Sequence, residues 1–139
     1  MNNGVWETKT WDGSFTSVHG EYIWSDNTNY YYSNNKAQYV LNGNTWEKKT
    51  WSGLTSFTGD MIWKENNTVY YGKNATQYVL NGSTWSSKTW SNLSDVSGKY
   101  FWTDGQNLYY SYFASNFEFK NGEFIPKTWP GLEYFHGKD

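Results

Sequence analysis

The chain has 139 residues and a formal net charge of −2, and all of its cationic side chains are lysines. Without arginine it lacks the forked donor that most proteins use to bind phosphates and bases, so we expect no nucleic-acid partner. No apolar run approaches the roughly 20 residues that span a bilayer, and residues 1–20 lack a signal-peptide core, so we expect neither a membrane partner nor a secretory leader. The absence of cysteine excludes disulfides and thiolate metal sites.

Aromatic residues dominate the composition and indicate a folded, all-β chain. There are 10 Trp, 13 Tyr and 8 Phe, together 22% of the residues. Each ring can bury about 150–250 Å², which compensates for the scarcity of aliphatic side chains. Abundant Asn, Ser, Thr and Gly fit strands joined by tight turns, whereas Ala and Leu are too few for a helical core. We therefore expect almost no helix.

The chain repeats itself with a period of about 39 residues, which is in the range of β-propeller blades. Lys-Thr-Trp recurs at 9–11, 49–51, 88–90 and 127–129. Other aromatic positions keep the same phase, and this recurrence predicts that they pack between repeats rather than bind a ligand. These positions are Trp24, Trp63 and Trp102 in the first strand, Tyr31, Tyr70 and Tyr109 in the second, and Trp46 and Trp85 in the fourth.

In chain order, the sequence predicts an orphan strand, three complete units and the start of another. The orphan strand covers residues 5–11 and carries Trp6 and Trp11. The units cover about 20–51, 59–90 and 98–129, and residues 137–139 open a further one. Within the second unit, aromatic and β-branched runs predict strands at 59–64, 68–71, 77–80 and 84–90, with a hairpin turn at Asn81-Gly82.

A short four-stranded sheet that is apolar on both faces must be covered by similar sheets on each side. Radial stacking of such sheets is the β-propeller arrangement, and we expect these units to be its blades. A β-trefoil, which also has three units of about forty residues, is the alternative. Trefoil strands tend to have one wet face, whereas the Tyr-Ile-Trp and Tyr-Tyr-Tyr runs at 22–24 and 30–32 have none.

The repeat resembles the kelch type found in the central propeller of galactose oxidases. In that type, a Tyr in the third strand is followed seven residues later by a Trp in the fourth. The corresponding pairs here are Tyr39 with Trp46, Tyr78 with Trp85, and Phe117 with Phe124. The Gly-Gly doublet of kelch repeats is absent.

A closer resemblance is to Trp-rich, kelch-like repeats of bacteriophage and prophage tail or minor structural proteins. The residues that carry it are Lys-Thr-Trp-Ser-Gly-Leu at 49–54 and Gln-Tyr-Val-Leu-Asn at 77–81. The resemblance implies a non-enzymatic module for assembly or host-surface adhesion, located on a virion or an extracellular surface.

Three blades are fewer than the four to eight of typical propellers. We therefore expect a head-to-tail homodimer that closes a six-bladed ring. Residues 5–11, with Trp6 and Trp11, would replace or pack on the last outer strand of the partner, which contains Pro126. Two alternatives remain: the chain belongs to a longer array, or it is an inert scaffold that only self-associates.

Catalytic chemistry is not indicated by the sequence. Its histidines, His19 and His136, each precede the first glycine of a unit, which suggests a structural role, and they do not form a metal-binding pattern. Asp26, Glu65 and Asp104 fall at the same hairpin turn, where a carboxylate commonly binds the backbone. We expect no enzyme activity, no metal and no cofactor.

Tyr112 and Phe113 are the candidate site residues, because they interrupt the repeat. They occupy a predicted loop where the other units have Asn34-Asn35 and Lys73-Asn74. Exposed aromatic residues in a loop could contact a ligand, a second subunit or the next blade. Since sugar rings stack on aromatic side chains, a carbohydrate-binding lectin is the alternative function.

Overall fold

The computed structural model describes residues 19–113, 115–131 and 135–137. The predicted strand at 5–11, with Trp6 and Trp11, and residues 138–139 lie outside the described residues. The described chain is built of β-strands and three single-turn 3-10 helices: η1 (Gly20–Tyr22), η2 (Gly59–Met61) and η3 (Gly98–Tyr100). No helix in the described ranges is long and apolar enough to cross a membrane.

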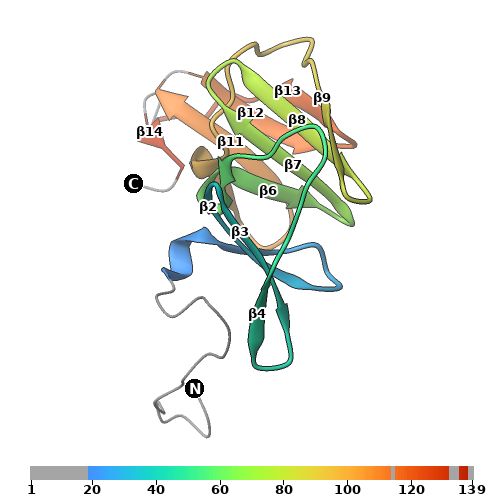
Figure 1. The fold of residues 1–139 in the computed structure, drawn as a ribbon. Helices are drawn as coiled ribbons and strands as arrows, with labels where there is room; N and C mark the ends of the chain where they lie inside the picture. The colour runs from blue at the N-terminus through green and yellow to red at the C-terminus, as the bar shows by residue number, and fades with distance from the viewer. Residues whose placement is uncertain (1–18, 114, 132–134, 138–139) are drawn as a thin grey trace, which may run out of the picture.

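The strands form three antiparallel sheets, each a meander of four strands in chain order (Figure 1). Sheet 1 contains β1 (Ile23–Ser25), β2 (Tyr30–Asn35), β3 (Ala37–Asn42) and β4 (Thr45–Lys48). Sheet 2 contains β6 (Ile62–Glu65), β7 (Thr68–Lys73), β8 (Thr76–Asn81) and β9 (Thr84–Ser87). Sheet 3 contains β10 (Phe101–Thr103), β11 (Leu108–Phe113), β12 (Ser115–Lys120) and β13 (Glu123–Pro126). Two short strands, β5 (Phe57–Thr58) and β14 (Phe135–His136), pair with β2 and β11.

This arrangement confirms the all-β fold of propeller-like blades. Each unit keeps its four strands in its own sheet, whereas a trefoil would share strands in a common barrel. The three sheets do not close a ring within the described residues. The first strand of the second unit begins at Ile62, three residues later than expected, because Gly59–Met61 coils into η2.

The hairpins between the third and fourth strands are of two kinds, although the sequence reads Asn-Gly at all three. In sheets 1 and 2 the Asn ends the strand, and the turn is Gly43-Asn44 or Gly82-Ser83, with positive φ only at the glycine. In sheet 3 the turn is Asn121-Gly122, with positive φ at both residues. These are the patterns of type II′ and type I′ turns, whose twist suits a hairpin. The three turns keep the 39-residue spacing of the repeat, and it is the Asn-Gly dipeptide that is shifted by one residue in sheet 3.

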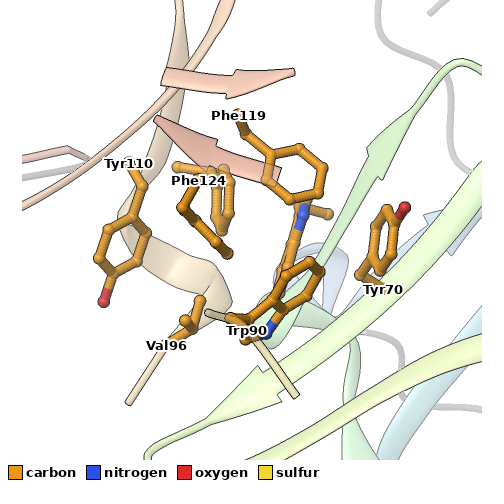
Figure 2. Packing of buried hydrophobic residues seen from close by; sticks show 8 residues of the cluster. Tyr70, Trp90, Val96, Tyr110, Phe119 and Phe124 are labelled. Carbon is orange, nitrogen blue, oxygen red and sulfur yellow. The ribbon is translucent and has the colours of Figure 1, made fainter. Parts of the chain in front are cut away.

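Sheet 2 lies between the other two sheets, and an aromatic layer fills each interface. Layer 1, between sheets 1 and 2, has a buried core of Trp24, Tyr31, Trp51, Phe57, Val69, Tyr71 and Trp85. Layer 2, between sheets 2 and 3, has a buried core of Trp63, Tyr70, Trp90, Val96, Phe101, Tyr110, Phe119 and Phe124. Figure 2 shows part of layer 2, with Trp90 and Phe119 beside Tyr70, and Phe124 beside Tyr110. Because the segments between sheets also supply rings, each layer is completed by the chain that links its two sheets.

The outer edge of sheet 2 is covered by one of these linking segments. The amide of Ser52 donates to the carbonyl of Ser83 over 3.0 Å, and the amide of Trp85 donates to the carbonyl of Ser52 over 2.8 Å. Ser52 thus forms a parallel bridge beside β9. This pairing satisfies backbone groups that an edge strand would otherwise expose.

Candidate functional site

The outer face of sheet 3, turned away from sheet 2, repeats the aromatic group that fills both inner layers. In layer 1, Trp24, Tyr31 and Trp51 pack together, and Trp63, Tyr70 and Trp90 do the same in layer 2. On sheet 3 the equivalent rings are Trp102, Tyr109 and Trp129, with Trp129 5.7 Å from Trp102 and 5.2 Å from Tyr109 between ring centroids.

The three groups differ in how far they are covered. The tyrosines of the three groups are equally buried, but the tryptophans are not: Trp51 and Trp90 are 3% and 7% exposed, whereas Trp102 and Trp129 are only half-buried. The two tryptophans of sheet 3 are therefore less covered by the described residues than the same residue types in the inner layers. Repetition predicted that these rings pack, but it did not show which group would lie at an end of the stack.

Strand register identifies the other residues of this outer face. Trp102 pairs with Tyr109, Tyr109 with Glu118, and Glu118 with Ile125, so the four side chains form one row across the sheet. The equivalent rows are Trp24, Tyr31, Val40 and Glu47 in sheet 1, and Trp63, Tyr70, Val79 and Ser86 in sheet 2.

The last two positions of this row have the opposite polarity to those of sheets 1 and 2. Glu118 stands where the inner sheets place Val40 and Val79, and Ile125, 43% exposed, stands at the polar outer position. Sequence reasoning missed both residues. Comparing the three repeats position by position, after fixing which strand residues face the next sheet, would have found them.

Asp104 fixes the tyrosine of this face by bonding within its own hairpin turn. Its Oδ1 accepts from the amides of Gln106 and Asn107 at 2.9 and 2.8 Å, and its Oδ2 accepts from the Tyr109 hydroxyl at 3.3 Å. The amides of Asn107 and Gln106 hold the pKa of the Asp104 carboxyl below its usual value. The turn role expected for this carboxylate is therefore seen in the structure.

Asp26 is arranged in the same way in sheet 1. Its carboxylate accepts from the amides of Thr28 and Asn29 and from the Tyr31 hydroxyl, at 2.9, 2.8 and 3.0 Å. Burial acts to raise the pKa of Asp26, but the hydrogen bonds, led by that from Asn29, outweigh it and lower the pKa.

Glu65 occupies the same turn position in sheet 2 but binds a different element. Its two carboxylate oxygens accept from the amides of Asn121 and Gly122, at 2.7 and 2.8 Å, in the β12–β13 turn of sheet 3. The longer side chain thus ties two sheets together instead of closing its own turn. The Glu65 carboxylate therefore binds backbone amides, as expected at this position, but those of another turn.

Tyr112 lies beside a second feature, a polar cleft between sheets 2 and 3. The cleft has a volume of about 360 Å³ and is lined by Met61, Lys73, Asn74, Asp95, Ser97, Lys99, Tyr100, Tyr110 and Tyr112. The ring of Tyr112 is 38% exposed and stands 4.6 Å from that of Tyr100, at an interplanar angle of 32°. Two adjacent tyrosine rings with amide, hydroxyl and charged groups nearby could hold a polyhydroxylated ligand.

Phe113 does not line this cleft, although it adjoins Tyr112 in the chain. It is 52% exposed, has a φ of 54°, and places its ring 4.6 Å from that of Tyr112 in an edge-on arrangement. Both residues lie at the end of β11 rather than in a loop, because β14 extends the pairing of this strand to Phe113. The two candidate residues therefore have different surroundings.

The remaining predicted aromatic residue, Trp46, is buried on the face of sheet 1 turned away from sheet 2, where its ring lies 6.3 Å from that of Tyr32. Among the described residues, no group of three or more His, Asp or Glu side chains is placed to hold a metal ion. No protein-family model matches the chain, and neither a curated protein nor a solved structure matches it.

Proposed function

We propose that this protein is a non-enzymatic assembly module that self-associates head to tail, with a homodimer as the favoured state. The outer face of sheet 3 would stack on sheet 1 of a second copy, and two copies would contribute six blades to a ring. The observation that carries the proposal is the third aromatic group, Trp102, Tyr109 and Trp129. Its two equivalents each pack against a following sheet.

The composition of this face supports a reversible association. Ile125 and Trp129 offer apolar surface, but Glu118 places a carboxylate in the middle of the row. A buried carboxylate is costly unless the partner supplies a donor, so this face is less apolar than the inner layers. Less apolar interfaces are typical of partners that form and separate.

The proposed biological setting is a phage or prophage structural protein, with a role in assembly or adhesion to a host surface. The resemblance of the repeats to Trp-rich, kelch-like repeats supports this setting.

Sedimentation velocity across micromolar concentrations tests the self-association. Ile125→Asp places a charge on the exposed part of the outer face, and we expect it to weaken association about tenfold or more without lowering the melting temperature. Ser87→Asp is the matched control, because Ser87 is exposed on the corresponding outer strand of sheet 2. A monomer at every concentration would contradict self-association, and an unchanged dissociation constant for Ile125→Asp would contradict this face.

Glycan binding is the second candidate function, and the cleft beside Tyr112 favours it. A glycan array would show signal for the parent chain and loss of signal for Tyr112→Ala. Tyr30→Ala is the control, because Tyr30 is 59% exposed and does not line the cleft. Equal signal from Tyr112→Ala and the parent would contradict binding in this cleft.

A further inference from the structure

The boundary after each sheet is built in the same way three times. The segment before each new unit pairs with the end of the second strand of the preceding sheet, β5 with β2 and β14 with β11. Between sheets 2 and 3, the amide of Val96 donates to the carbonyl of Asn74 over 3.0 Å, at the equivalent place. A glycine follows each of these pairings, at positions 59, 98 and 137.

Close approach explains why each of these residues is glycine. A Cβ atom added there would overlap the carbonyl oxygen of the last 3-10 residue in the preceding sheet. The pairs that share this approach are Gly59 with Tyr22, Gly98 with Met61, and Gly137 with Tyr100. Only glycine lets the two backbones come so near. Gly137 is further held by its amide, which donates to the carbonyl of Ser111 over 2.9 Å.

Gly20 holds the same position in the first unit but has no such neighbour. Within the described residues, nothing lies within 4 Å of a Cβ built on Gly20, and its φ is not positive. Neither the space left by the described residues nor the backbone conformation therefore requires glycine at this position. The dipeptide His19-Gly20 is also identical to His136-Gly137, whereas the two internal boundaries have Thr58 and Ser97 before the glycine.

We infer that the segment ending at His19-Gly20 docks on β11 and the Tyr100 carbonyl of a second copy, in the place that residues 135–137 fill within one chain. The inference rests on the proposed function, because it supplies the backbone contact of the same head-to-tail interface. The incoming segment adds a strand to β11, a mode of recognition in which main-chain hydrogen bonds provide affinity.

Two segments thus compete for one site, and the competition regulates assembly. Residues 135–137 belong to the same molecule as β11 and have a high effective concentration there. A second copy must displace them, which is an exchange of equivalent elements between protomers. Intramolecular docking of Gly137 therefore limits self-association, and releasing it favours the dimer.

Two glycine variants test the competition with opposite expected results. Gly20→Ala should weaken self-association about tenfold or more, because its Cβ would meet the Tyr100 carbonyl of the partner. It should leave the melting temperature of the monomer unchanged, because that Cβ meets no described atom within the chain. Gly137→Ala should instead strengthen self-association, because it loosens the competing segment. Gly59→Ala is the control. Because Gly59 already lies against the Tyr22 carbonyl within the chain, this variant should lower the melting temperature.

The outcomes separate this inference from the proposed function. If the parent self-associates and both variants leave its dissociation constant unchanged, the proposed competition between the two segments is wrong. The proposed stacking of sheet 3 on sheet 1 of a second copy is then unaffected. If Gly20→Ala lowers the monomer's melting temperature, this glycine has a contact within the chain and the inference is also overturned. If the parent and both variants remain monomeric in sedimentation velocity, the proposed self-association itself is wrong.

Discussion

Replacing Phe124 by Trp should destabilise the protein, although it restores the residue that the other two units carry at this position. Phe124 is buried in layer 2, 4.9 Å from Trp90 and 4.9 Å from Phe119 between ring centroids. In sheet 2 the equivalent Trp85 stands on a face that also carries Ile62 and Leu80, whereas sheet 3 has Phe at both of those positions. The added phenyl rings thus occupy the space that an indole needs.

The size of the effect follows from overpacking a closed layer. Forcing extra atoms into a well-packed core costs about 1–3 kcal/mol, because rings leave their preferred rotamers. With a urea dependence of about 2 kcal/mol per molar, the unfolding midpoint of Phe124→Trp should fall by roughly 0.5–1.5 M. Circular dichroism during urea titration measures this shift independently of the added tryptophan's fluorescence.

A rescue variant separates overpacking from other causes. Adding Phe119→Leu and Phe101→Ile to Phe124→Trp copies the sheet 2 combination and should recover most of the lost stability. Unchanged or increased stability in the Phe124→Trp single variant would refute the packing argument. A triple variant less stable than the single variant would refute the compensation between these three positions.

Three further predictions follow from contacts between and within sheets. Gly98→Ala should lower the free energy of unfolding by about 2–3 kcal/mol in urea titration, because its Cβ overlaps the Met61 carbonyl, and unchanged stability would show that the backbones separate freely. Glu65→Ala should cost about 1–2 kcal/mol by loss of its charged hydrogen bonds to the sheet 3 turn, measured against Glu123→Ala, an exposed carboxylate nearby. Because the folded-state pKa of Asp104 is lowered, its contribution to stability is present above the unfolded pKa of about 3.9 and is lost as pH falls through the folded pKa. Asp104→Asn should therefore be less stable than the parent at neutral pH and equally stable in strong acid, and a difference that persists in acid would contradict this assignment.

Local structure was predictable because strand and turn signals lie within a few residues of one another. Runs of aromatic and β-branched residues predicted the four strands of a unit, and repetition predicted that Trp24 and Trp63 would have equivalent surroundings. The boundaries were less accurate. The 3-10 turn at Gly59–Met61 begins where Gly59 approaches the Tyr22 carbonyl of the preceding unit, and the extension of β11 to Phe113 depends on pairing with β14.

The candidate site was less predictable, because it depends on what covers each repeat. Tyr112 and Phe113 were predicted as site residues because they interrupt the repeat. Only Tyr112 lines a cleft, and residues of sheet 2 form part of the lining of that cleft. Glu118 also interrupts the repeat, but the sequence does not indicate that it belongs to the site. It does so only because its side of β12 faces away from sheet 2, which the strand register shows.

By itself, the sequence determined the period from the recurrence of its motifs, and it determined the all-β class and the four-stranded unit from runs of strand-forming residues separated by turn residues. Tertiary structure alone decided which copy of each pattern is enclosed. Trp51 and Trp129 are the same residue in the same local motif, but only Trp51 lies between two sheets of the described chain. Burial depends on whether a sheet lies inside the stack or at its end. A periodic sequence carries nearly the same residues in every sheet, so it does not show which sheet lies at the end.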